Sequence, residues 1–195
     1  MKRLLPFLLA LPVTIACAQN GHERRYELRP DPNWPLAIEL SSGDYQIVPS
    51  ESDCIAVVYQ ENAPEEARKV EVQIASGHGQ NTLKIAAPKS NFRAVIEVPR
   101  KTDLRVRMIT GELHVGDVEG NKDIEMRAGN LELNSLRPRD YAKADFSVRV
   151  GDLKAPSFKE VKSGIWRSFH TYGPGKYRLH AYVGVGDLTL RTDKI

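Results

Sequence analysis

Acidic side chains recur at one position of a short repeated motif, and a column of them could bind a divalent cation. In each copy a glycine is followed by an acidic or amide residue and then by an aliphatic residue or tyrosine. Carboxylate oxygens are the ligands that Ca²⁺ prefers. One acid per copy is fewer than a calcium-binding β-roll supplies, so we expect these side chains to accept hydrogen bonds from backbone N–H groups at a turn. The prediction is therefore no metal and no cofactor. The copies begin with Gly43-Asp44, Gly111-Glu112, Gly129-Asn130, Gly151-Asp152 and Gly186-Asp187.

Histidines and catalytic motifs give little indication of an active site. His170 and His180 are ten residues apart and could meet across a hairpin, but a metal site there would lack a third ligand. No nucleophile elbow, phosphate-binding loop or dinucleotide fingerprint occurs. We predict that the protein has no catalytic residues and is not an enzyme. The alternative is a carbohydrate-active or other envelope enzyme whose site has no recognisable motif.

Aromatic side chains gather in residues 163–176, and they are the best candidates for binding. Trp166, Phe169 and Tyr172 could stack on a glycan or pack against a partner protein. The interpretation that we favour is different: these side chains cap the open end of a repeat array, where apolar rows would otherwise meet water.

Each glycine motif occupies the same place in an apolar pattern. Around Gly129, for example, Ile124 and Met126 precede the glycine and Leu131 and Leu133 follow it. In a straight strand every second residue faces inward, so the inward residues are all at odd or all at even positions. Here the apolar residues change from even to odd positions across the glycine. We predict a bulge or a sharp corner there, because glycine reaches positive φ without a Cβ penalty. The residue directly before the glycine is also expected to face inward, as at Val150 and Val185.

These patterns predict an all-β chain. Alternating segments before residue 100 indicate an antiparallel meander, including a hairpin over 70–86. The later glycines are 18, 22 and 35 residues apart, which predicts a β-solenoid-like or rolled sheet of repeated short strands, with an aromatic-rich insertion at 163–176 in the longest gap. We expect one domain over 34–195, after an extended lead-in over 19–33.

The N-terminus predicts export. A basic start is followed by an apolar stretch from Leu4 to Ala16, so residues 1–18 are interpreted as a signal peptide and the mature chain as beginning at Gln19. The same segment loosely fits a lipoprotein signal, with Cys17 as the candidate lipid attachment site. The expected location is the periplasm or the cell surface, with the protein either soluble or lipid-anchored, and contact with a membrane only through that anchor.

Loss of the signal changes the charge balance. Residues 1–18 contain two of the 28 basic residues and none of the 25 acids, which leaves 26 against 25 and a formal charge of +1. A nearly neutral chain with scattered charges offers no electrostatic basis for nucleic-acid binding.

The chain resembles a bacterial putative-adhesin family, whose exported members are built of Gly-Asp-Ile-x-Val-like units. The resemblance runs from about Leu36 to Leu190 and includes Ser42-Gly43-Asp44, Ile96-Glu97-Val98-Pro99 and the later Gly-acid copies. It implies a β-solenoid or rolled sheet and no catalytic residues. The aromatic segment and the small number of copies depart from the family pattern and argue against a long adhesive stalk. The expected function is a non-enzymatic structural, adhesive or interaction module of the cell envelope, with an unknown envelope protein or glycan as its partner.

Overall fold

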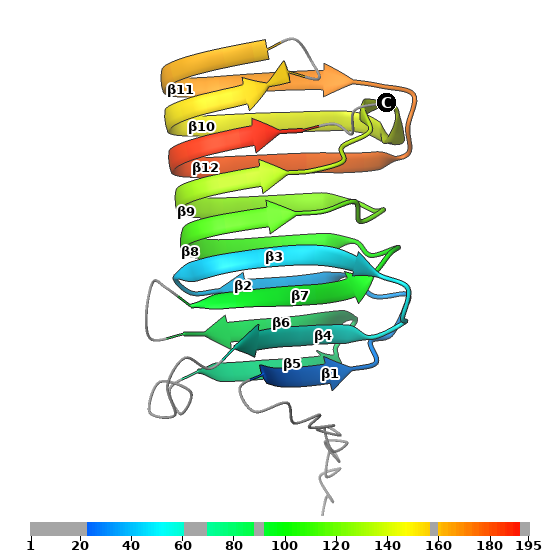
Figure 1. Cartoon of the computed structure of the whole chain (residues 1–195). Helices are drawn as coiled ribbons and strands as arrows, with labels where there is room; N and C mark the ends of the chain where they lie inside the picture. The colour runs from blue at the N-terminus through cyan, green and yellow to red at the C-terminus, as the bar shows by residue number, and fades with distance from the viewer. Residues whose placement is uncertain (1–22, 61–69, 88–91, 157–159, 192–195) are drawn as a thin grey trace, which may run out of the picture.

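The protein is all-β in the computed structural model, which describes residues 23–60, 70–87, 92–156 and 160–191. Twelve strands form one mixed sheet (Figure 1). The strands of the first half are β1 (Glu23–Leu28), β2 (Leu36–Leu40), β3 (Gly43–Ser50), β4 (Ile55–Gln60), β5 (Glu71–Gly77), β6 (Gln80–Ala86) and β7 (Arg93–Pro99). They are followed by β8 (Leu104–Val115), β9 (Lys122–Leu133), a short 3-10 helix η1 (Pro138–Asp140), β10 (Tyr141–Ala155), β11 (Glu160–Tyr172) and β12 (Tyr177–Leu190).

The sheet forms two layers because its long strands change partners along their length. The first half of β8 lies parallel to β2, with Leu36 opposite Leu104, and its second half lies parallel to β3, with Gly43 opposite Gly111. One layer thus continues through β2 to β6 and β5, and the other through β3 to β7, β4 and β1. Figure 1 shows the long strands curving at one margin of the molecule, where they pass from one layer to the other.

The antiparallel meander predicted for the first half is only partly present. β5 and β6 form an antiparallel hairpin, and β4 lies antiparallel to both β1 and β7. β2 and β3, however, lie parallel to all their neighbours. The physical reason is that only Ser41 and Ser42 separate β2 from β3, and the chain continues across the bend between them instead of reversing. β2 and β3 thus follow the two halves of β8 across its bend, as one bent strand would.

Chain order and spatial order differ in the second half. β8, β9, β12 and β10 lie side by side and parallel, so the last strand of the chain sits between two earlier ones. β11 pairs antiparallel with β10 and forms the edge of the sheet.

The five glycines of the sequence motif lie in one row across the bend. Gly111 is opposite both Gly43 and Gly129, and Gly129 is opposite Gly186. A Cβ atom on Gly151 would overlap the carbonyl oxygen of Gly186, so Gly151 continues the row. In the four long strands the glycine φ lies between +120° at Gly111 and +135° at Gly151, a region that side chains with a Cβ rarely adopt.

Residues just before the glycines face outward, so the inward assignment of Val150 and Val185 is wrong. Their side chains are 40% and 48% exposed, respectively. The last buried residue before Gly186 is Val183 among the large apolar side chains, and the first one after it is Leu188. The change of parity is therefore spread over the residues of the bend.

One hydrophobic core fills the space between the layers. In-register positions carry Val106, Ile124, Ala181 and Phe146 on four adjacent strands, all buried. Burial of such apolar side chains stabilises the fold by about 25 cal/mol for each Å² removed from water.

Candidate functional site

The aromatic segment forms most of the edge strand. Residues 163–172 belong to β11, which pairs with β10 along its length, and residues 173–176 connect β11 to β12. Gly164 lies opposite Gly151 with a φ of +116° and extends the glycine row by one strand. The sequence pattern did not indicate Gly164, because Ile165 and Trp166 follow it where the other copies have an acid and an aliphatic residue.

The three predicted contact residues lie on two faces of β11. Trp166 and Tyr172 are 74% and 72% exposed. Phe169 is half-buried, and its ring stacks on that of Phe146 with centroids 6.2 Å apart. Phe169 therefore anchors the strand to the core, and the two exposed rings are available for contacts with other molecules.

Trp166 does not cap the end of the core, because its side chain is largely in solvent. The guanidinium of Arg149 on the neighbouring strand lies 6.0 Å from the ring centroid, within the range of a cation–π contact. The ring of Tyr172 meets that of His170 edge-on at 6.2 Å. The outer face of β11 is thus an aromatic and polar surface at the edge of the sheet.

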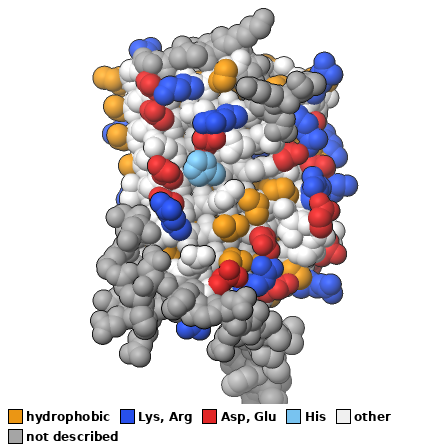
Figure 2. Space-filling model, in the orientation of Figure 1, with side chains coloured by type: hydrophobic (Ala, Val, Ile, Leu, Met, Phe, Trp, Pro, Cys, Tyr) orange, Lys and Arg blue, Asp and Glu red, His pale blue; other side chains and the backbone are white. Residues whose placement is uncertain are grey.

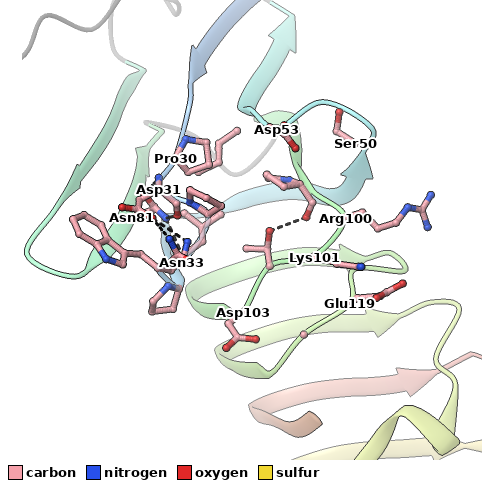
Figure 3. A pocket seen from close by; sticks show the side chains of 18 of the residues that line it. Pro30, Asp31, Asn33, Ser50, Asp53, Asn81, Arg100, Lys101, Asp103 and Glu119 are labelled. Atoms are coloured by element: carbon pink, nitrogen blue, oxygen red, sulfur yellow. Dashed lines mark hydrogen bonds between the residues drawn. The ribbon is translucent and has the colours of Figure 1, made fainter. Parts of the chain in front are cut away.

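A hollow of about 670 Å³ lies at the margin opposite the bend, where loops join the strands. It is lined by residues 29–36, 50–55 and 99–103, with Asn81 and Tyr177 among the others (Figure 3). Acidic and basic side chains both line it, and several are already paired: the Arg100 guanidinium donates to Glu51 at 2.8 Å. These charges hold the loops together and do not converge on one point.

Asn81 is the buried polar residue beside this hollow, and all its contacts are internal. Its amide nitrogen donates to the carbonyl oxygens of Asp31 and Trp34 at 3.0 and 3.1 Å. Its amide oxygen accepts from the Asp31 N–H and from the Ser76 hydroxyl. Asn81 therefore fixes the segment before β2 to β6, which explains its burial without a ligand.

Lys122 and Tyr141 form a buried polar pair between the layers. The Lys122 ammonium donates to the Tyr141 hydroxyl at 2.7 Å and to the Val118 carbonyl. Burial is the main cause that lowers the pKa of Lys122 to about 8, and burial also raises the pKa of Tyr141 above its usual range. Lys122 lies opposite Leu104 and Leu179 on the neighbouring strands. Its inward position could be recognised in the sequence only by aligning the glycine motifs, which places this lysine where the neighbouring copies have leucine.

The carboxylates of the glycine motif are paired within the sheet. The Lys154 ammonium lies 3.3 Å from an Asp152 oxygen and 3.4 Å from an Asp187 oxygen. The Asp152 N–H also donates to Asp187 at 3.1 Å. This agrees with acids that accept hydrogen bonds at the bend, and Lys154 supplies positive charge where a cation would have to bind.

One group of potential metal ligands lies on the outer face of the other layer. Single ligand atoms of Asp123, Glu125 and His180 fall within 4.8 Å of one another. The Arg107 guanidinium, however, donates to Asp123 at 2.8 Å and lies 3.2 Å from Glu125. The Arg105 guanidinium also lies 3.5 Å from Asp123. Two guanidinium groups thus balance the two carboxylates, and the geometry favours a salt-bridged surface.

His170 and His180 do not meet. Both lie opposite Asp145, on the two strands that flank β10, so one strand separates them.

The predicted signal peptide, and Cys17 within it, lie outside the described residues. Among the residues that the structure describes, no helix has the length and apolar character needed to cross a bilayer.

Comparison with known proteins shows a likeness in fold. No family model matches the chain, and no curated protein matches its sequence. The structure is similar to that of a putative cell adhesion protein from Clostridium sporogenes, with a TM-score of 0.56 and 16% identity over 88% of this chain and 99% of the other.

Two further solved structures match more weakly. A putative adhesin from Parabacteroides merdae has a TM-score of 0.27 and 13% identity over 59% of this chain and 62% of its own. A putative lipid binding protein from Parabacteroides distasonis has a TM-score of 0.27 and 13% identity over 88% of this chain and 63% of its own. Of these three structures, the one from Clostridium sporogenes has a TM-score above 0.5 and indicates a shared fold.

Proposed function

We propose that the protein is a non-enzymatic module of the bacterial cell envelope that binds another envelope component in the manner of an adhesin. The observation that carries this proposal is the edge strand β11, which exposes Trp166 and Tyr172 at the margin of the sheet. Aromatic side chains on an open surface suit adhesion to a glycan or a protein, whereas small-molecule sites are concave. The fold likeness to a putative cell adhesion protein supports the same function.

The architecture is interpreted as a short β-roll of repeated units within the putative-adhesin family. The single glycine row and the shared register of β8, β9, β12 and β10 support this interpretation. A roll of this kind gives a rigid support for a contact surface. The enzymatic alternative gains no specific support, because Lys122 and Tyr141, whose pKa values shift most among the described residues, hydrogen-bond each other in the interior.

Export is part of the proposal, with the mature protein beginning either at Gln19 or at a lipidated Cys17. Mass spectrometry of the N-terminus of the protein recovered from cells distinguishes these two forms. A protein that keeps residues 1–18 and stays in the cytoplasm would contradict the envelope location.

The contact surface can be tested by direct binding. Exported wild-type protein is applied to a glycan array and to immobilised envelope fractions, beside Trp166→Ala/Tyr172→Ala. We expect wild type to bind a component of the envelope and the double variant to lose at least about tenfold in affinity, since large aromatic side chains dominate such contacts.

The matched control is His78→Ala, which changes an exposed ring in the β5–β6 turn at the other end of the sheet. It should bind as wild type does. Equal binding by the Trp166/Tyr172 variant and wild type would reject β11 as the contact surface. Turnover of an envelope glycan by the purified protein would instead support the enzymatic alternative.

A further inference from the structure

The exposed apolar side chains of the molecule are concentrated on its bend. Six large apolar side chains are exposed in the described part of the chain, and five of them lie next to the glycine row. We name these five the bend ridge: Ile109, Val150, Ile165, Trp166 and Val185. Tyr172, at the far end of β11, is the sixth. Clusters of exposed apolar side chains are uncommon on soluble monomers, and they often mark a site of interaction with another molecule.

The bend ridge is continuous across neighbouring strands. Val185 of β12 lies opposite both Ala128 of β9 and Val150 of β10, and Val150 lies opposite Ile165 of β11. Adjacent strands are about 4.8 Å apart, so this row is about 14 Å long from β9 to β11. Ile109 of β8, 50% exposed, lies beyond the β9 end of the row, and Trp166, 74% exposed, follows Ile165 on β11. Figure 2 shows hydrophobic side chains along the margin where the strands bend.

Cationic side chains without a carboxylate partner adjoin the ridge. Arg127 and Arg149 each stand two residues before a glycine of the row and are exposed. Among the described residues neither forms an ion pair with a carboxylate, and Arg149 instead contacts the Trp166 ring. On the other flank, Asp152 and Asp187 are paired with Lys154. On the flank before the glycines, the charge available to a ligand is therefore that of the two arginines.

The shape of the ridge restricts what can cover it. The row lies on the outside of a bend, so it projects from the molecule and offers no concave site for a small ligand. A fluid bilayer can accommodate a projecting row of Val, Ile and Trp side chains at the level of its headgroups. Arginine side chains beside such a row can reach lipid phosphates while their alkyl stems stay in apolar surroundings.

We propose that the bend ridge inserts into the surface of a phospholipid bilayer, with Arg127 and Arg149 binding phosphate groups of the lipid heads. The protein then lies along the membrane through its own fold, in addition to any lipid anchor. This inference rests on the proposed envelope location, because only there does the chain meet such a surface.

Vesicle binding tests the inference. The chain carries Cys17→Ser, so that no lipid can be attached, and is mixed after export with sedimentable vesicles of phosphatidylcholine alone or with phosphatidylglycerol. We expect binding to both and stronger binding to the mixture. In a Trp34→Phe background, where Trp166 is the remaining tryptophan, its emission should shift to the blue on binding. Val150→Asp/Val185→Asp should weaken binding by at least about tenfold, because it places two carboxylates in the apolar row.

The matched control is Ser147→Asp/Thr189→Asp, which adds the same two charges to the same strands, β10 and β12, away from the ridge. It should retain most of the wild-type binding. Arg127→Ala/Arg149→Ala should lose the preference for phosphatidylglycerol and keep the binding to phosphatidylcholine. If the aspartate pair prevents folding, Val150→Ser/Val185→Ser replaces it and should also weaken binding.

Several results would overturn the inference. The first is that wild type binds neither kind of vesicle. The second is that the ridge variants and the control variant lose vesicle binding equally. The third is that light scattering shows a dimer without lipid, which the ridge variants convert to a monomer. The dimer would assign the ridge to a second copy of the chain. Trp166 belongs to both surfaces, whereas Tyr172 lies outside the ridge. Binding of Tyr172→Ala alone to glycans or envelope proteins therefore tests the proposed function separately from the ridge variants, and either proposal can fail alone.

Discussion

Gly129 shows at the level of one residue why the bend needs glycine. Its φ is +121°, and a Cβ atom there would overlap the carbonyl oxygen of Gly111 on the adjacent strand. Any side chain therefore requires both a strained backbone and a displaced neighbouring strand. We expect Gly129→Ala to lower the free energy of unfolding by at least about 2 kcal/mol, measured by chemical denaturation.

The matched control is Gly77→Ala in the β5–β6 hairpin, where a Cβ atom would meet no other atom within 4 Å. That variant should change stability by less than about 1 kcal/mol, since the position lacks both causes of strain. Equal stability of the two variants would reject the structural requirement for glycine in the row.

Lys122 makes stability depend on alkaline pH. Its pKa is lowered to about 8 in the folded state, so between pH 8 and its ordinary value of 10.5 the unfolded chain binds more protons than the folded one. The free energy of unfolding therefore rises with pH across this window, and Lys122 contributes at most about 3 kcal/mol to the rise. Below pH 8 Lys122 is charged in the folded state, so the folded protein bears the full cost of burying that charge.

We expect Lys122→Met to flatten this rise, because methionine keeps a similar volume and carries no charge. Urea denaturation of both proteins from pH 7 to about 9.5 measures the difference before Tyr141 adds its own dependence. Parallel pH profiles for the two proteins would show that Lys122 is not the cause.

At the level of elements, β11 is held more weakly than the long strands beside it. Among the described residues it pairs only with β10, whereas β12 pairs with both β9 and β10. Hydrogen exchange should therefore be faster at the outward N–H groups of β11 than in β12 or β9, because fewer of its backbone groups are bonded. Equal protection in β11 and β12 would indicate that a second molecule covers this edge.

Much of the strand content could be predicted from alternation and from the glycine motif. Segments such as 104–115 and 177–190 alternate clearly and contain a glycine at the change of parity. The strand order could not be predicted, because the spacing from Gly151 to Gly186 does not reveal that β12 lies between β9 and β10. The length of that gap arises from a complete strand, β11, with its own glycine at 164.

The candidate site was only partly accessible from the sequence. Composition indicated Trp166 and Tyr172, but their exposure depends on the edge position of β11, which is a tertiary property. The outward direction of Val150 and Val185 was missed, since simple alternation extends the inward row one residue too far. Arginine two residues before the glycine and an apolar residue directly before it, as in Arg127-Ala128 and Arg149-Val150, are the signal that could have indicated part of the ridge.

At the level of the whole molecule, the two margins expose different kinds of side chain. The bend carries exposed apolar and cationic side chains, and the opposite margin carries loops joined by internal contacts such as those of Asn81. The long strands connect the two margins through a single core. We therefore expect substitutions of the exposed side chains on the outside of the bend to leave the packing between the layers intact.

The place of β12 has a consequence for synthesis. While residues 177–190 are still inside the ribosome, β9 and β10 lack the strand that lies between them in the finished sheet, about two strand spacings apart. The two parts of the later sheet can join only when this last strand inserts between them. We therefore expect a nascent chain that has not released residues 177–190 to leave the facing edges of β9 and β10 unpaired.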